Sequence, residues 1–161
     1  MANLNVVITE EITLPNRNVE KTSNTKVISG INQIVRRIDT IVSTFSGSGI
    51  EIIKFSDSEE QQTAGSFVKS DVKYIRITHI SGNSDALIYL IADGPESVIL
   101  NLSPGKTIML NDADINAASS ADYVVDDYVD PTYYSSFVTL NTIKAKAVSS
   151  SIQLEYFVAS I

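Results

Sequence analysis

The stretch Val72-Lys73-Tyr74-Ile75-Arg76-Ile77-Thr78-His79-Ile80 decides the fold class of this chain. Apolar and polar side chains alternate along its central part, which is the period of a strand with one buried face. We expect Ile75 and Ile77 to face a core, and Arg76 and Thr78 to face the opposite way. The stretch therefore predicts a half-buried β-strand.

The same pattern recurs on both sides of a tight turn further along the chain. Ser97–Leu102 places alternate apolar residues on one face, and Lys106–Leu110 resumes the alternation after Ser103-Pro104-Gly105. In such a Pro-Gly pair, proline fixes φ at the second position of a type II turn, and glycine adopts the positive φ of the third. The segment predicts two strands joined as a β-hairpin.

Short strands separated by turns account for most of the remaining chain. Glycine-containing turns occur at 46–49, 81–83 and 93–95. Seven or more such strands with hardly any helical periodicity predict an all-β fold. We expect an antiparallel β-sandwich, jelly-roll-like, over residues 29–161, preceded by an extended N-terminal arm and linker over residues 1–28. The other expected strands are Ile50–Phe55, Phe67–Val68, Ala86–Ala92, Phe137–Val148 and Ser151–Ser160.

One segment, Ile31–Phe45, fits two interpretations. Its apolar residues are spaced like the stripe of an amphipathic helix. It is also rich in β-branched residues, which lose rotamer freedom in a helix, and it contains no Ala or Leu. We expect a strand that is buried on both faces over part of its length, with a short helix as the alternative.

The N-terminal segment predicts an amphipathic strand. One parity is shared by Leu4, Val6, Ile8, Ile12 and Leu14 and is broken only at Glu10, and Pro15 ends the strand. The polar stretch Asn16–Lys26 then indicates a linker. The strand is either an ordinary first strand followed by a long loop, or an arm that pairs with a sheet edge of a neighbouring subunit. As an arm, its contact residues are Leu4, Val6, Ile8 and Ile12.

Composition excludes several classes of function. The chain has 161 residues, a mass of 17.5 kDa and a formal net charge of −7 at pH 7. This charge argues against partners that need clustered Lys and Arg, namely nucleic acid and an anionic membrane surface. The lack of cysteine excludes disulfides and thiolate chemistry. The apolar runs are too short to span a membrane and no secretion signal is evident, so we expect synthesis in a cytoplasm.

The residues that catalysis requires are sparse. His79 is the single histidine and shares the inward parity of Ile75 and Ile77, so we expect a core or rim residue rather than a general base. No nucleophile elbow or phosphate-binding glycine loop occurs. Glu10-Glu11 and Glu59-Glu60 are chain neighbours, whose side chains point apart on an extended strand. We therefore expect neither an enzyme nor a bound cofactor.

An acidic, tyrosine-rich segment lies between Lys106 and Lys144, and no basic residue interrupts it. Its start, Asp112–Asn116, resembles a calcium loop, but an EF-hand needs Gly and Glu where Ala117 and Tyr123 stand. A different ion site remains an alternative, made from Asp122, Asp126, Asp127 or Asp130. Because tyrosines concentrate at interfaces, the segment predicts a contact surface for a protein partner or a glycan, with a loop that packs its own tyrosines as the alternative. The predicted contact residues are Tyr123, Tyr128, Tyr133 and Tyr134.

Several strand sequences resemble those of small virion structural proteins of aquatic tailed phages. The resemblance is carried by Ser29–Ile38, Val72–Thr78, Leu102–Ile108 and Ile152–Ala159. Such β-rich proteins include head decoration (cement) proteins and tail or fibre components. The resemblance implies a virion protein that stabilises the head by binding the major capsid protein, or other virion proteins, across capsomer boundaries.

A capsid-coating role agrees with the residues themselves, because it needs strand edges, arms and aromatic loops but no cofactor. Capsid lattices offer threefold positions and small β-proteins commonly assemble with closed cyclic symmetry, so we expect a homotrimer. Two alternatives remain. One is a tail, adaptor or fibre component of the virion, and the other is a carbohydrate-binding or adhesion module, against which the lack of Trp counts.

Overall fold

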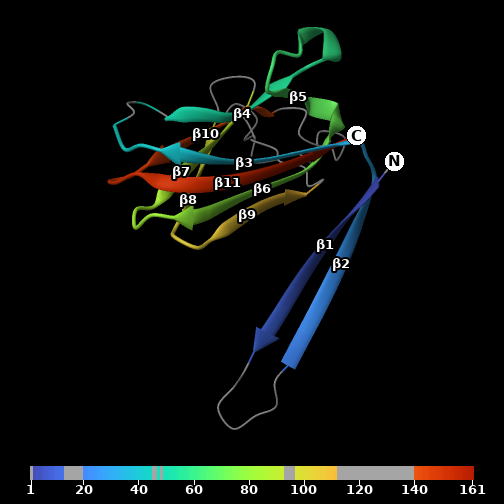
Figure 1. Ribbon diagram of the computed structural model, residues 1–161, viewed down its shortest axis with the longest axis horizontal. Coiled ribbons are helices and arrows are strands. Elements are labelled where there is room, and N and C mark those ends of the chain that lie inside the picture. The colour runs from blue at the N-terminus through green and yellow to red at the C-terminus, as the bar shows by residue number, and fades with distance from the viewer. Residues whose placement is uncertain (1, 13–19, 45–46, 48, 93–96, 112–139) are drawn as a thin grey trace, which may run out of the picture.

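The computed structural model describes residues 2–12, 20–44, 47, 49–92, 97–111 and 140–161 (Figure 1). The predicted all-β class is confirmed, since these residues form strands and two single-turn 3-10 helices. The strands are β1 (Ala2–Ile12), β2 (Glu20–Ile31), β3 (Gln33–Ile41), β4 (Ile50–Ser56), β5 (Ser66–Val68), β6 (Val72–Ser81), β7 (Ala86–Ala92), β8 (Ser97–Leu102), β9 (Thr107–Asn111), β10 (Leu140–Ala147) and β11 (Ile152–Ser160). The 3-10 helices are η1 (Glu59–Gln61) and η2 (Lys69–Asp71).

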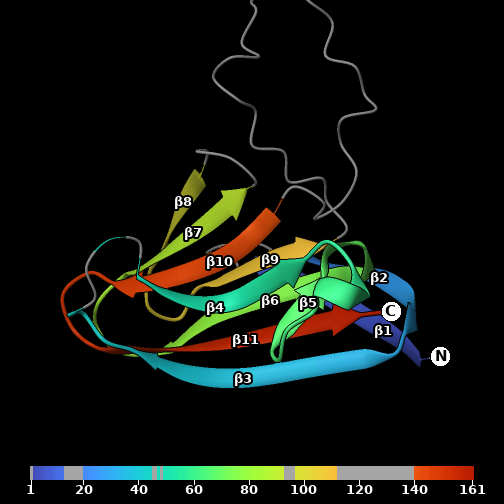
Figure 2. The same ribbon diagram turned by 90° about the horizontal axis from the view of Figure 1, so that it is seen from above.

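The sandwich has the strand order of a jelly roll. One sheet has the order β5-β4-β10-β7-β8 and the other β3-β11-β6-β9; Figure 2 shows how they stack. Four antiparallel pairs are nested along the chain, with β7–β8 innermost, then β6–β9, β4–β10 and β3–β11. Successive pairs alternate between the two sheets, so the chain resembles one long hairpin that has been rolled up. The short strand β5 is added parallel to β4.

The main core lies between the inner faces of the two sheets. Ile75 and Ile77 are fully buried in it, and Arg76 and Thr78 lie on the outer face, which confirms the alternation predicted for Val72–Ile80. Each large aliphatic side chain that is fully removed from water contributes about 1.5–3 kcal/mol to folding. Other fully buried apolar residues of this core are Ile41, Ile53, Ile88, Ile143, Ile152 and Leu154.

The turn predicted at Ser103-Pro104-Gly105 is present, but the hairpin predicted around it is wrong. Lys106 N donates to Ser103 O at 3.1 Å, and Gly105 has a φ of +74°. The flanking strands belong to different sheets, because β8 pairs with β7 and β9 pairs with β6. The turn therefore carries the chain from one sheet across the sandwich to the other.

Strand connections meet and interlock at the end of the sandwich opposite the chain termini (Figure 1). Ser149 N, between β10 and β11, donates to Ser84 Oγ, between β6 and β7, at 2.8 Å. Gly49, just before β4, has a φ of +85°, and a Cβ on it would lie 2.1 Å from Ala145 O of β10. The backbone at Gly49 thus approaches β10 more closely than any other residue type permits.

Strand β3 corrects the expectation for Ile31–Phe45. The segment is a strand, as predicted, but it forms the edge of the four-stranded sheet and is not buried on both faces. Ile34 and Ile38 on its outer face are 55% and 53% exposed, while Ile41 on its inner face is fully buried. The helix-like spacing arises because apolar residues occupy both faces, one of which stays in solvent.

The N-terminal segment is a β-hairpin rather than a strand and a linker. β1 pairs antiparallel with β2, with Leu4 opposite Ile28 and Ile12 opposite Glu20. The expected linker Asn16–Lys26 is therefore strand from Glu20 onward, and β1 is not an ordinary first strand of the sandwich. Polar threonine, serine and asparagine suit a ribbon with both faces in water. Figure 1 shows the hairpin projecting away from the sandwich.

Candidate functional site

The hairpin β1–β2, hereafter the arm, is attached to the sandwich through its base. There, a small apolar cluster joins the arm to the outer face of the four-stranded sheet. The cluster is separate from the main core. The arm therefore needs the sandwich for its attachment, whereas the main core of the sandwich contains no residue of the arm. Its members are Leu4, Val6, Ile28 and Ile31 of the arm and Tyr74, Phe157 and Ala159 of the sheet.

The arm exposes apolar side chains on both of its faces. Ile8 and Ile12, on the face that carries Val6, are 44% and 57% exposed. Val7 and Val27, which are on the other face, are 56% and 54% exposed. Exposed large apolar residues that gather on one projecting element are typical of a surface that binds another protein.

The sequence predicts Leu4, Val6, Ile8 and Ile12 as contact residues of the arm, and the structure places them in two different surroundings. Leu4 and Val6 contact the chain's own sheet, whereas Ile8 and Ile12 are in solvent. The parity argument missed Val7, which interrupts the alternation that defined the strand. It also missed Val27, because the face on which Val27 lies can be assigned only once the pairing of β2 with β1 is known.

Among the described residues, few side-chain interactions stabilise the outer half of the arm. Thr9 and Ser23 form a long hydrogen bond of 3.4 Å across the two strands. Lys21 and Glu11 form an ion pair of 3.6 Å between side chains that are 61% and 52% exposed, and such pairs contribute about 0–1 kcal/mol. An isolated two-stranded hairpin is marginally stable in water at best. The arm therefore has the properties of an element that is completed by a partner.

A second exposed apolar surface continues from the base of the arm across the four-stranded sheet. We call it the outer face and define it by Ile34 and Ile38 of β3, Phe157 of β11 and Met109 of β9. Ile34, Ile38 and Met109 are 55%, 53% and 43% exposed. The ring of Phe157 packs edge-to-face on Tyr74, with their centroids 5.9 Å apart, and so ties the outer face to the base of the arm.

Glu155 holds two arginines in place on the outer face. Its carboxylate accepts hydrogen bonds from Arg36, whose Nε lies at 2.8 Å, and from Arg76. The hydrogen bond from Arg36 lowers the pKa of Glu155, against the opposing effect of burial, and Arg76 lowers it further. Arg76 also lies over the ring of Phe157, 5.7 Å from its centroid. This ion cluster therefore carries one net positive charge next to exposed apolar side chains.

His79 is a core residue, as the sequence predicts. Its side chain is fully buried on the inner face of β6, and neither ring nitrogen has a hydrogen-bond partner among the described residues. Burial lowers the pKa of His79, and the nearby Asp85 carboxylate opposes this effect only in part. The imidazole is thus neutral in the folded protein at pH 7.

His79 predicts a pH dependence of stability. The unfolded chain binds a proton at His79 near pH 6.5, whereas the folded chain does not until lower pH. The unfolded state therefore gains protons first as the pH falls, and the free energy of unfolding decreases below about pH 6.5, by at most about 1.4 kcal/mol per pH unit. Urea denaturation between pH 7.5 and 5.5 measures the slope, which His79→Gln should reduce. An identical slope in the variant would contradict this account.

The other predicted sites lie outside the described residues, among them the four tyrosines Tyr123, Tyr128, Tyr133 and Tyr134 and the aspartates of the possible ion site. Within the described part of the chain, no group of three or more His, Asp or Glu side chains is placed to hold a metal ion. No helix in that part has the length and apolar character needed to cross a membrane. Comparison with protein-family models, curated proteins and solved structures gives no match.

Proposed function

We propose that this chain is a structural protein of a virus particle, which decorates the capsid as a homotrimer and binds the major capsid protein across capsomer boundaries. The observation that carries the proposal is the arm, whose outer half exposes apolar side chains on both faces. In a monomer such an element would be a disadvantage, because exposed apolar surface and unpaired strand edges promote aggregation. An assembled particle gains an attachment point.

The jelly roll supports the proposal without deciding it. This strand order occurs in viral capsid proteins, and also in lectins and cupins. Because one fold serves many functions, the assignment depends on the interaction surfaces and not on the topology. The arm and the outer face are both suited to protein contacts, and neither requires a cofactor.

The proposed trimer is supported by the way in which the two surfaces complement each other. The arm and the outer face lie on different parts of the chain, so the arm of one copy packs on the outer face of the next. Contacts of this head-to-tail kind close into a ring when the rotation between copies allows it. The arm also brings the exposed carboxylate of Glu10, and the outer face presents the net positive charge of its ion cluster.

The test combines the oligomeric state with capsid binding. Sedimentation velocity of the purified chain should give three times the mass of the 17.5 kDa protomer. The chain should also co-sediment with empty, expanded capsids assembled from the major capsid protein that is encoded nearest to its own gene. A monomer that does not bind these capsids contradicts the proposal. A trimer that binds purified tails instead would favour the tail, adaptor or fibre assignment.

A further inference from the structure

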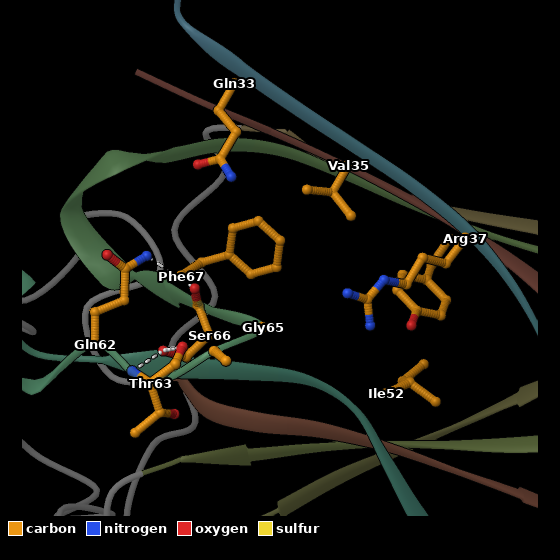
Figure 3. A pocket seen from close by; sticks show the side chains of 11 residues that line it. Gln33, Val35, Arg37, Ile52, Gln62, Thr63, Gly65, Ser66 and Phe67 are labelled. Carbon is orange, nitrogen blue, oxygen red and sulfur yellow. Dashed lines mark hydrogen bonds between the residues drawn. The ribbon is translucent and has the colours of Figure 1, made fainter.

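A cavity of about 410 Å³ opens between the edges of the two sheets, where β3 lies opposite β4 and β5. This volume is in the range of pockets that hold small ligands. Figure 3 shows the side chains of Gln33 and Arg37 pointing into the cavity from β3. Gln62 and Phe67 point into it from the opposite wall (Figure 3). The cavity belongs neither to the arm nor to the outer face.

Arg37 is the one charged side chain among the residues that line this cavity. It lies beside the hydroxyl of Tyr156 and lowers the pKa of that hydroxyl, which donates to Asp39 Oδ2 at 2.8 Å. Tyr156 is 2% exposed, and burial together with Asp39 raises its pKa to about 12, so its hydroxyl keeps the proton that it donates. A buried, fixed hydroxyl thus lies next to Arg37, and among the described residues most of the five N–H donors of the guanidinium are left for a ligand.

The opposite wall supplies neutral polar groups and an apolar surface. Gln62 Nε2 donates to Ser66 O at 2.9 Å, which orients the amide and leaves its oxygen for a ligand. The ring of Phe67 is 6% exposed and provides a flat apolar surface in the cavity. Gly65, with a φ of +86°, has no atom within 4 Å of the place where a Cβ would lie, so the rim stays low and open.

We propose that this cavity binds an acidic saccharide. Arginine recognises a carboxylate with two parallel hydrogen bonds, and the guanidinium of Arg37 points into the cavity. The amides of Gln33 and Gln62 both donate and accept hydrogen bonds, as sugar hydroxyls require, and the ring of Phe67 fits the apolar C–H face of a sugar ring. The proposal is independent of the assembly role, since the residues that carry it are not those of the arm.

The test is a titration of ¹⁵N-labelled protein with glucuronic acid, followed by NMR. The signals of Gln33 and Gln62 and their neighbours should shift in a saturable way, and those of the arm should not. Glucose, which lacks the carboxylate, should bind at least tenfold more weakly. Arg37→Gln should weaken binding of glucuronic acid at least tenfold. Arg36→Gln, which makes the same change of charge on the other face of β3, should leave the affinity unchanged.

Several outcomes would overturn the proposal. One is the absence of saturable shifts with glucuronic acid, and another is equal affinity for glucose. Equal weakening by both arginine variants would assign the effect to net charge rather than to the cavity. If acetate alone binds as tightly as glucuronic acid, the ligand is a simple carboxylate and not a saccharide. Sedimentation of the wild-type and Arg37→Gln samples separates this result from the assembly proposal, which predicts a trimer for both.

Discussion

Replacing Ile8 and Ile12 together with serine is expected to weaken self-association of the chain by about a hundredfold or more. Each isoleucine that an assembled neighbour buries contributes about 1.5–3 kcal/mol, and each 1.4 kcal/mol is a factor of about ten in affinity. The two side chains are 44% and 57% exposed in the single chain. The substitutions therefore remove contacts with a partner and not with the core, so the sandwich should keep its native β-structure. Sedimentation velocity measures the association, and circular dichroism follows the fold.

The matched control replaces two apolar residues of equal exposure that lie away from the arm. Ile99 and Val148 are 53% and 55% exposed, and their double serine variant should remain trimeric. If both double variants lose association to the same extent, the interface is not specific to the arm. If neither does, the exposed apolar residues of the arm are not contact residues.

The alternation of side chains predicted the strands because it is a local property of the backbone. Ile75 and Ile77 are buried and Arg76 is outside, as their parity requires. The turn at Ser103-Pro104-Gly105 was predictable for the same reason, since glycine tolerates a positive φ and proline fixes its own. In both cases the residues that determine the structure are neighbours in the chain.

The partner of each strand was not predictable from these local patterns. The turn between β8 and β9 has the sequence of a hairpin, yet the two strands lie in different sheets. In those sheets β7 and β6 also pair with β10 and β11, which are distant from them in sequence. The polar strand β2 was missed for a related reason, because a ribbon in water needs no apolar alternation.

The cavity was beyond the reach of sequence patterns altogether. Arg37 and Gln62 come from separate elements, and Tyr156 comes from the last strand of the sandwich. No spacing in the sequence relates these residues, and only the rolled-up topology brings the edge β3 opposite β5. By contrast, Ile8 and Ile12 were identified from the sequence, because the parity of a single strand is sufficient to place them on one face.

Gly49→Ala is expected to destabilise the protein by about 3 kcal/mol or more. A Cβ at this position would lie 2.1 Å from Ala145 O and 2.7 Å from Ala145 C, both backbone atoms of β10 that a side-chain rotation cannot move. Overpacking of this kind costs about 1–3 kcal/mol, and the left-handed backbone at a φ of +85° costs an alanine about 1–2 kcal/mol more. The change therefore pushes β4 away from β10 in the five-stranded sheet.

Gly105→Ala separates the clash from the backbone effect. Gly105 also has a positive φ, +74°, but no atom lies within 4 Å of the place where its Cβ would be. Gly105→Ala should therefore lower the free energy of unfolding by only about 1–2 kcal/mol. Urea denaturation of both variants gives the two free energies. If both variants lose the same free energy of unfolding, Gly49 is required only for its φ. The backbone near β10 would then accommodate the added Cβ without destabilisation. A Gly49→Ala chain that is unfolded in buffer, beside a folded Gly105→Ala, places the whole difference on the contact with β10. The contact matters because Gly49 lies where the connection from β3 enters the five-stranded sheet. Strand β4 can pair with β10 there only if the two backbones approach closely.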